Sequence, residues 1–273
     1  MIDVHCHLNF HAFEKDFEEV ANNAFKHGVS KIINTGTSIV SSKKAVKLAQ
    51  DYENLYAIIG IHPHHADKTD KEFEGELQTD WLEKLEIMAK NPKIVGIGEI
   101  GLDYFSYKSN GIVEKKLQKE VFEAQIELAH KLNLPLQIHG RLAGKDILEI
   151  LNHHKNILKS DFPGMFHCFA GDLEILKGAL NLGFFIGFDG NITYPGLAPK
   201  ETIQLSKIAL KTPLERILTE TDSPFLTPIP LRGSRNEPKN VIIVGEFLAK
   251  IKNLSFEEIN QITTENAIKV FNL

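Results

Sequence analysis

The chain of 273 residues lacks the features of several protein classes. It has only two cysteines, Cys6 and Cys168, too few for a disulfide framework, and we expect no bond between them. No apolar run is long enough to cross a bilayer, and Asp3 and His5 interrupt the apolar stretch that a signal peptide would need. We therefore expect a cytoplasmic protein without membrane contact. We also expect both cysteines to be reduced and buried, each facing away from the neighbouring histidine.

An excess of positive charge and a dinucleotide motif are also missing. The net charge is −5, so a broad basic surface that wraps duplex nucleic acid is not indicated, although a short single-stranded end could still bind. No Gly-x-Gly-x-x-Gly segment follows a predicted strand, so nothing supports a dinucleotide site. With 42% hydrophobic residues and no linker or repeat, residues 1–273 are expected to form a single domain.

Strand-like and helix-like segments alternate along the whole chain. Helical patterns are clearest over residues 13–26, 117–132, 241–252 and 256–270, the last beginning with a Ser255-x-x-Glu258 capping box. The predicted strands cover residues 2–5, 31–35, 56–61, 94–98, 135–139, 164–167, 184–188 and 216–221. Eight strands separated by helices predict a (β/α)8 TIM barrel, with an open doubly wound sheet as the alternative.

Two histidines near the N-terminus are the first candidate metal ligands. His5 and His7 lie two residues apart on a predicted strand, so both side chains project from the same face, as a pair of metal ligands would. A lone His-x-His is a weak signal. It becomes strong here because four more potential ligands lie at or just past the carboxyl ends of other predicted strands, where sites cluster in parallel α/β folds: Glu99, His139, His167 and Asp222.

Four imidazoles and two carboxylates favour two divalent ions over one. We expect Glu99 to bridge the ions, because a carboxylate has two oxygens. One site would be completed by His5, His7 and Asp222, and the other by His139 and His167. Nitrogen and oxygen ligands without thiolate favour Zn, Mn, Fe or Mg over Cu(I). Taken singly, His139 and His167 could be ordinary strand-end histidines, and Asp222 could cap a turn.

The remaining histidines divide into two groups. His62 follows the third predicted strand and could hold a substrate phosphate or cap a turn. His64 and His65 are expected to be solvated, and three others are expected at surface or helix positions: His11, His27 and His130.

The motifs in this order strongly resemble those of the TatD family of metal-dependent deoxyribonucleases, a TIM-barrel branch of the amidohydrolase superfamily. The resemblance spans the whole chain. The segments that carry it are DVHCHL (3–8), GIHPH (60–64), GEIGLDY (98–104), FHCFAG (166–171) and TDSPFL (221–226), the last followed by PLRGSRNEP (230–238).

The resemblance implies hydrolysis of phosphodiester bonds, typically trimming of DNA ends in the 3′-to-5′ direction. We expect metal-activated water to attack phosphorus, with Asp222 and Glu99 as the catalytic residues. Asp222 would orient the water and accept its proton. Candidate phosphate contacts are His62, Arg141 and Arg232, although Arg232 could instead order its loop through a salt bridge. The expected partner is the single-stranded end of DNA, and no obligate protein partner is predicted.

One residue departs from the family pattern. The family usually follows the His139 position with a small residue, an arginine and then an acid. Here Arg141 is kept, but Leu142 replaces the acid. The metal ligand His139 is unchanged. The departure puts in doubt any contact that the acid makes with groups around the metal, and the adjustment of the site to its substrate.

Two other functions remain open at this point. The same site could attack a carbonyl, as in a lactonase, amidase or aminoacyl-tRNA deacylase, because TIM barrels change substrate by changing loops. Arginines and histidines at the mouth would favour phosphate, whereas a closed apolar pocket would favour a neutral ester or amide. A non-catalytic scaffold would need a closed coordination shell with no open position for water.

Overall fold

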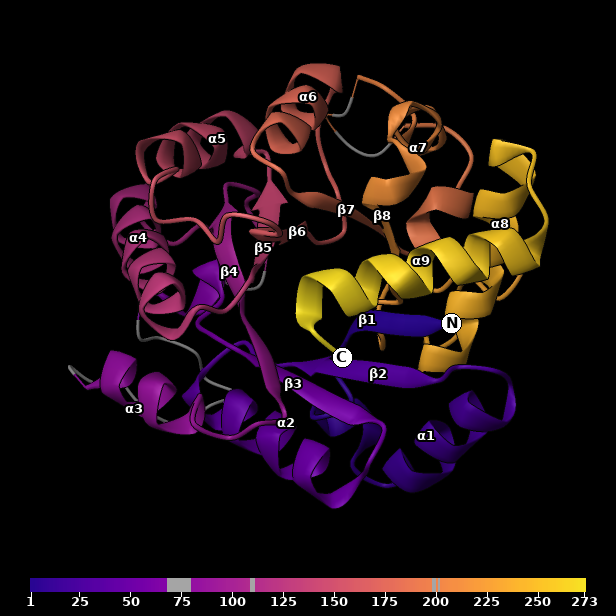
Figure 1. The fold of residues 1–273 in the computed structure, drawn as a ribbon, viewed down its shortest axis with the longest axis horizontal. Coiled ribbons are helices and arrows are strands. Elements are labelled where there is room, and N and C mark those ends of the chain that lie inside the picture. The colour runs from indigo at the N-terminus through magenta and orange to yellow at the C-terminus, as the bar shows by residue number, and fades with distance from the viewer. Residues whose placement is uncertain (68–79, 109–110, 198–199, 201) are drawn as a thin grey trace.

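The computed structural model describes residues 1–67, 80–108, 111–197, 200 and 202–273. Its core is one eight-stranded parallel sheet in which the strands follow chain order, surrounded by helices (Figure 1). The strands are β1 (Ile2–Cys6), β2 (Lys31–Thr35), β3 (Leu55–Ile59), β4 (Ile94–Asp103), β5 (Leu136–Arg141), β6 (Gly164–Phe166), β7 (Phe185–Phe188) and β8 (Ile217–Thr219). The predicted (β/α)8 barrel is confirmed.

The helices alternate with these strands, and one more follows at the C-terminus. They are α1 (Phe17–Lys26), α2 (Ile39–Asp51), α3 (Trp81–Met88), α4 (Lys115–Leu132), α5 (Gly144–His153), α6 (Leu173–Asn181), α7 (Leu205–Lys211), α8 (Val241–Lys252) and α9 (Phe256–Phe271). Within the described residues, no helix combines the length and the apolar character needed to span a membrane.

The element boundaries differ from the predicted ones at two places that matter. The helix predicted over residues 13–26 begins later, because a 3-10 turn (His11–Phe13) first buries Phe13 in the core. Strand β4 extends well beyond the predicted end at residue 98, so Glu99 belongs to the strand itself. The predicted capping box is present at the start of α9, where Ser255 and Glu258 each accept the other's backbone N–H.

The interior of the barrel is apolar at one end and polar at the other. Helix α9 contacts β1 and β8 and places Ala267, Val270 and Phe271 against the interior apolar side chains of the strands. These strand residues are Ile2, Val4, Ile33, Ile58, Val95, Met165, Phe185 and Leu218. Nearer the carboxyl ends of the strands the buried side chains become polar, as at Thr35 on β2 and Gln137 on β5. The fold therefore leaves only the carboxyl ends of the strands for a polar site.

Strands β1 and β4 each contain an extra residue just where a candidate ligand lies. Asp3 pairs with Ile32 of β2, and the next pair is Cys6 with Asn34, so β1 has one residue more than β2 over this stretch. The same irregularity separates the pairs that Ile97 and Ile100 of β4 make with β5. An inserted residue of this kind re-aims the neighbouring side chains. It lets His5 and Glu99 turn into the barrel.

Strand β8 is joined to β1 by side chains and by the loop that follows β8. The Asp3 carboxylate accepts hydrogen bonds from the backbone N–H and the hydroxyl of Thr221, at 3.0 and 2.7 Å. The backbone N–H of Asp222 donates to the carbonyl of His5 at 2.9 Å, and that of His7 donates to the carbonyl of Ser223 at 2.7 Å. These bonds close the barrel and place Asp222 beside the two histidines.

We expect Asp3→Ala to destabilise the metal-free protein by about 2–4 kcal/mol, because two buried donors of Thr221 lose their acceptor. Burial raises the pKa of Asp3 well above its usual value, so the neutral isostere in Asp3→Asn should retain most of the stability. Urea unfolding of both variants measures the difference. Equal midpoints for the alanine variant and the unaltered protein would show that this contact does not hold the barrel closed.

Candidate metal centre

The N-terminal pair of histidines lies inside the barrel, beside Asp222. The Nε2 atoms of His5 and His7 are 3.0 Å apart. Asp222 Oδ1 lies 3.5 Å from the first of these nitrogens and 3.3 Å from the second. Both imidazoles are buried, and the Asp222 side chain is 14% exposed. The three side chains therefore face one point that solvent can reach from the Asp222 side.

The second nitrogen of each ring determines which atoms could bind a cation. His5 Nδ1 lies 2.8 Å from Gln137 Oε1, and His7 Nδ1 lies 2.9 Å from the carbonyl oxygen of Thr35. The carbonyl of Thr35 can only accept, and Gln137 presents its oxygen, so both Nδ1 atoms carry hydrogen. If both rings are neutral, their two Nε2 lone pairs point at each other across 3.0 Å. Burial acts to lower the pKa of His7, but Asp222 and Glu99 outweigh it and raise that pKa, so a proton between the two nitrogens is favoured. A metal cation between them would likewise remove the repulsion of the lone pairs.

The two oxygens of Glu99 face different groups of imidazoles. Oε2 lies 3.8 Å from His5 Nε2 and 3.7 Å from His7 Nε2. Oε1 lies 2.7 Å from His139 Nδ1 and 3.6 Å from His167 Nε2. Although burial alone would raise the pKa of Glu99, the surrounding imidazoles hold it well below its usual value. The carboxylate is therefore ionised and directed to both sides of the site.

His139 and His62 present opposite tautomers to Glu99. His139 Nε2 lies 3.1 Å from Asp103 Oδ2, so Nε2 carries the hydrogen and Nδ1 faces Glu99. His62 Nδ1 instead accepts the backbone N–H of His64 at 3.1 Å, which leaves its hydrogen on Nε2, 3.5 Å from Glu99 Oε1. In this tautomer His62 is a hydrogen-bond donor to the site, whereas His139 can offer it a lone pair.

Their charge states also differ. Burial lowers the pKa of His62 to about 3, so the ring is neutral. Burial acts in the same direction on His139, but hydrogen bonds to Asp103 and Glu99 outweigh it and raise the pKa of His139 to about 10. Without a metal ion, His139 is therefore an imidazolium between two carboxylates at neutral pH.

His167 completes the arrangement from the end of β6. Its ring stacks on that of His5, with 3.4 Å between the centroids, and its Nδ1 lies 2.9 Å from Glu220 Oε2. This contact turns Nε2 towards Glu99. Burial raises the pKa of Glu220 to about 8, and the neighbouring His5 and the hydrogen bond from the Cys168 backbone only partly offset this effect.

The donor set fits divalent cations. Three groups have one potential ligand atom per residue, all lying within 4.8 Å of one another: His5, His7 and Asp222; His5, Glu99 and His167; and His62, Glu99 and His139. The six residues predicted as ligands are thus brought together, and His62 joins them. The Nε2 atoms of His5 and His7 face each other and His139 Nδ1 faces Glu99, and a cation at each position would take the place of the proton held there in the metal-free protein.

Several expectations about neighbouring residues were wrong. His64 is not solvated: its Nε2 lies 3.0 Å from Asp103 Oδ2, and its side chain is 18% exposed. His65 is also partly buried, with Nδ1 2.6 Å from the carbonyl oxygen of Thr37. Both histidines lie in the 3-10 turn (Pro63–His65) that folds back onto the site, which their polar sequence context did not reveal. The surface positions of His11, His27 and His130 are confirmed.

The cysteine expectations were partly right. Both cysteines are free, and Cys6 is buried. Cys168 is only partly buried and accepts a hydrogen bond from the Asn191 side chain at 3.4 Å. It follows the end of β6 in a left-handed conformation, with φ of 42°, so strand alternation no longer governs its direction.

The predicted phosphate-binding arginines are held by aromatic rings. The Arg141 guanidinium lies 4.0 Å from the centre of the Phe105 ring and donates to the hydroxyl of Tyr107 at 2.6 Å. That hydroxyl donates to Asp103 at 3.0 Å, so Arg141 is connected to His139. Arg232 lies at the surface, 4.0 Å from the centre of the Tyr194 ring.

Sequence reasoning missed the residues that orient the imidazoles. Gln137 interrupts an apolar strand, and Glu220 is an acid within the segment predicted as a strand over residues 216–221. Both were usable signals, because a buried polar side chain needs a partner. The involvement of Tyr107 depends on how the chain folds after β4, and no sequence pattern marked it.

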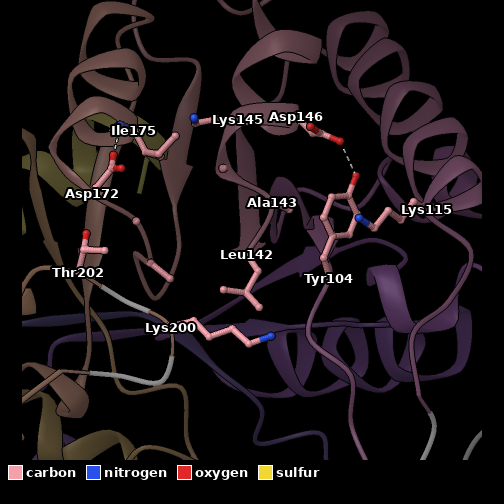
Figure 2. Close-up of a pocket in the computed structure, with 13 residues that line it drawn as sticks. Tyr104, Lys115, Leu142, Ala143, Lys145, Asp146, Asp172, Ile175, Lys200 and Thr202 are labelled. Atoms are coloured by element: carbon pink, nitrogen blue, oxygen red, sulfur yellow. Dashed lines mark hydrogen bonds between the residues drawn. The ribbon is translucent and has the colours of Figure 1, made fainter.

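A cavity of about 430 Å³ opens beyond the ends of β4, β5 and β6, and its lining residues Tyr104 and Leu142 directly follow Asp103 and Arg141 in the chain. Figure 2 shows Lys115, Lys145 and Lys200 around it, and Leu142 in its wall where the family pattern has an acid. The hydroxyl of Tyr104 donates to Asp146 at 2.8 Å, and Asp146 also pairs with Lys119 at 2.7 Å. The departure at Leu142 thus leaves one acid fewer among the three lysines that line this cavity.

Comparison with known proteins finds relatives over the full length of the chain. A model of the TatD-related DNases matches residues 2–272. The uncharacterised metal-dependent hydrolase YabD of Bacillus subtilis (strain 168) is 38% identical over 275 residues, covering 100% of this chain and 99% of the relative. The solved structure of YJJV, a TatD homologue of Escherichia coli K12, is 29% identical with a TM-score of 0.86, covering 100% of this chain and 98% of that one.

In the metal-free protein, we expect the His139 ring to titrate near pH 10 and the His62 ring near pH 3. Because the folded-state pKa of His139 lies above its unfolded value, its contribution to stability is complete below about pH 6.5 and disappears as the pH rises through about 10. Nitrogen-detected NMR of the imidazoles measures both values.

The Asp103→Asn variant serves as the control for this titration. It replaces the carboxylate that faces His139 Nε2 with a neutral amide, so the pKa of His139 should fall. An unaltered protein in which His139 titrates like an exposed histidine would show that the ion pairs described here do not form.

Proposed function

This chain belongs to the TatD-related DNase family of metal-dependent hydrolases, and we propose that it removes nucleotides from the 3′ ends of single-stranded DNA with two divalent cations. The observation that carries the proposal is the orientation of Glu99. Its two oxygens face two separate groups of imidazole nitrogens, as a bridging ligand requires. A single cation at His5, His7 and Asp222 would leave Oε1 facing the His139 imidazolium, and a second cation would take the place of that ring's proton.

We assign the first cation to His5 Nε2, His7 Nε2 and Asp222, and the second to His139 Nδ1 and His167 Nε2. Glu99 would face both cations with its two oxygens. The ions are Mg, Mn or Zn, in keeping with nitrogen and oxygen donors without thiolate. When bound, such ions act as Lewis acids that activate water and neutralise charge developing on the phosphoryl group.

Asp222 is suited to orient the attacking water and to accept its proton. Burial tends to raise the pKa of Asp222, but its hydrogen bonds to His5 and His7 lower it below the usual value, so the side chain is a carboxylate. Among the six proposed ligands, only His139 is more exposed than Asp222, at 17% against 14% of the side chain. A water arriving from solvent therefore meets an acceptor oxygen at the edge of the site.

His62 and Arg141 are suited to hold the phosphate. The neutral His62 ring keeps a hydrogen on Nε2, directed to the Glu99 side of the site, and can donate it to a phosphate oxygen. Arg141 uses one N–H on Tyr107, which leaves others for the substrate. These donors, together with the lysines around the neighbouring cavity, favour a polyanionic substrate over a neutral ester or amide.

We expect Glu99→Gln to lower the cleavage of 5′-labelled single-stranded DNA by on the order of 100-fold or more, because the bridge between the cations loses its charge. Metal analysis should show fewer than two ions per chain. His11→Gln, which changes an 81% exposed histidine, serves as the control and should leave both values unchanged.

The same preparations should be reloaded with Mg, Mn or Zn and tested on duplex DNA and on an activated carboxylic ester. Hydrolysis of the ester without cleavage of any DNA would overturn the proposal in favour of a carbonyl hydrolase. Full DNA cleavage by the Glu99→Gln protein would overturn the two-cation assignment.

We expect the double variant Lys115→Gln/Lys145→Gln to bind single-stranded DNA more weakly and with a smaller salt dependence. Each lost phosphate contact should reduce the slope of log K against log salt by about 0.7. Fluorescence anisotropy at several salt concentrations measures the slope. Lys116→Gln is the matched control, because this 81% exposed side chain lies on α4 and pairs with Glu120. An unchanged slope in the double variant would exclude the cavity from the DNA path.

A further inference from the structure

A pair of phenylalanines beside the histidine cluster has no part in the chemistry described so far. Phe10 stacks flat on the His7 ring, with 4.4 Å between centroids and an angle of 12°. Phe225 stands edge-on to Phe10, at 6.3 Å and 73°, and to His7, at 6.4 Å and 67°. The three rings form one continuous aromatic surface from the proposed ligand His7 to the rim of the barrel.

Phe225 leaves about half of its surface in water. It is 51% exposed, although it lies within reach of other rings. A single exposed apolar side chain is common, but this ring differs in that it continues an aromatic surface that begins at the proposed ligand His7. An occupant that covers Phe225 must also lie close to His7, because the two rings are in contact.

The backbone under Phe225 is held firmly in place. Its N–H donates to the carbonyl of Asp222 at 2.8 Å, so the ring and the proposed catalytic carboxylate belong to the same turn. The buried Asn236 side chain donates to the carbonyls of Phe225 and Thr221, at 2.7 and 2.8 Å. Asn240 donates to Asn236 in turn, at 2.8 Å. The exposed ring is therefore presented in a fixed position relative to Asp222.

We propose that Phe225, supported by Phe10, stacks the base of the 3′-terminal nucleotide whose 5′-phosphate lies at the histidine cluster. This inference rests on the proposed function and names the part of the substrate that the site recognises beyond its phosphate. A phenyl ring carries no hydrogen-bonding group, so it recognises the flat face of a base and not its identity. The structure thus assigns a base-stacking role without sequence preference to the loop after β8.

The first experiment removes the ring and the base separately. Two 5′-labelled oligonucleotides are compared, one ending in an ordinary nucleotide and one ending in an abasic tetrahydrofuran nucleotide. We expect the unaltered protein to cleave the abasic end with a kcat/KM about 5- to 100-fold lower, the range of a single base–aromatic stack. The Phe225→Ala protein should cleave both ends equally.

Phe225→Leu and Phe225→Tyr separate stacking from simple apolar contact. Leucine keeps apolar surface without a flat face, so the preference for the ordinary end should be mostly lost. Tyrosine keeps the face, so the preference should be retained. If Phe225→Ala prefers the ordinary end as strongly as the unaltered protein does, the stacking proposal is overturned while DNA cleavage itself stands.

The second experiment does not depend on cleavage. Calorimetry of the manganese-loaded protein compares deoxyadenosine 5′-monophosphate with 2-deoxyribose 5-phosphate, which lacks the base. We expect about 5- to 100-fold tighter binding of the nucleotide by the unaltered protein and equal binding by Phe225→Ala. This result without any DNA cleavage would support the stacking site and reject the proposed nuclease. Equal binding of both ligands by the unaltered protein would reject the stacking site.

Discussion

Buried lone pairs that point at one another are the constraint around which this barrel is organised. His5 and His7 turn the same ring nitrogen to a common point at 3.0 Å, and Glu99 keeps its charge although it is 4% exposed. An isolated buried carboxylate would take up a proton rather than stay ionised. Here the imidazoles prevent this, and bound cations would do so more completely. The fold therefore holds buried negative charge and ring nitrogens together in a place where a cation would be stabilised.

The rest of the interior serves to hold these nitrogens in position. Each ring points its second nitrogen away from the cluster, towards an acceptor on another part of the barrel. Gln137 and the carbonyl of Thr35 hold the N-terminal pair, Asp103 holds His139, and Glu220 holds His167. Such outer contacts select the tautomer and stiffen the ring, so that little reorganisation is needed when a cation binds. The apolar side chains of α9 fill the opposite end of the barrel and support this arrangement.

Different parts of the rim contribute different kinds of recognition. The end of β5 and the first turns of α4 and α5 supply the cationic side chains of Arg141, Lys115 and Lys145. Arg141 is held in place by Phe105 and Tyr107. The loop after β8 supplies aromatic and apolar surface around Phe225. A nucleotide has both characters, an anionic phosphate and a flat base. The cationic and the aromatic parts of the rim therefore correspond to the phosphate and the base of the proposed substrate.

The sequence by itself determined the barrel and the identity of the converging side chains, because strand periodicity and the position of polar residues at strand ends are local properties. Tertiary structure alone decided how the groups face one another. The added residues in β1 and β4 turn His5 and Glu99 inward, and the turn after β3 buries His64 against Asp103. Tautomers, shifted pKa values and the exposure of a ring at the rim depend on partners distant in the chain, and spacing along a sequence does not encode those distances.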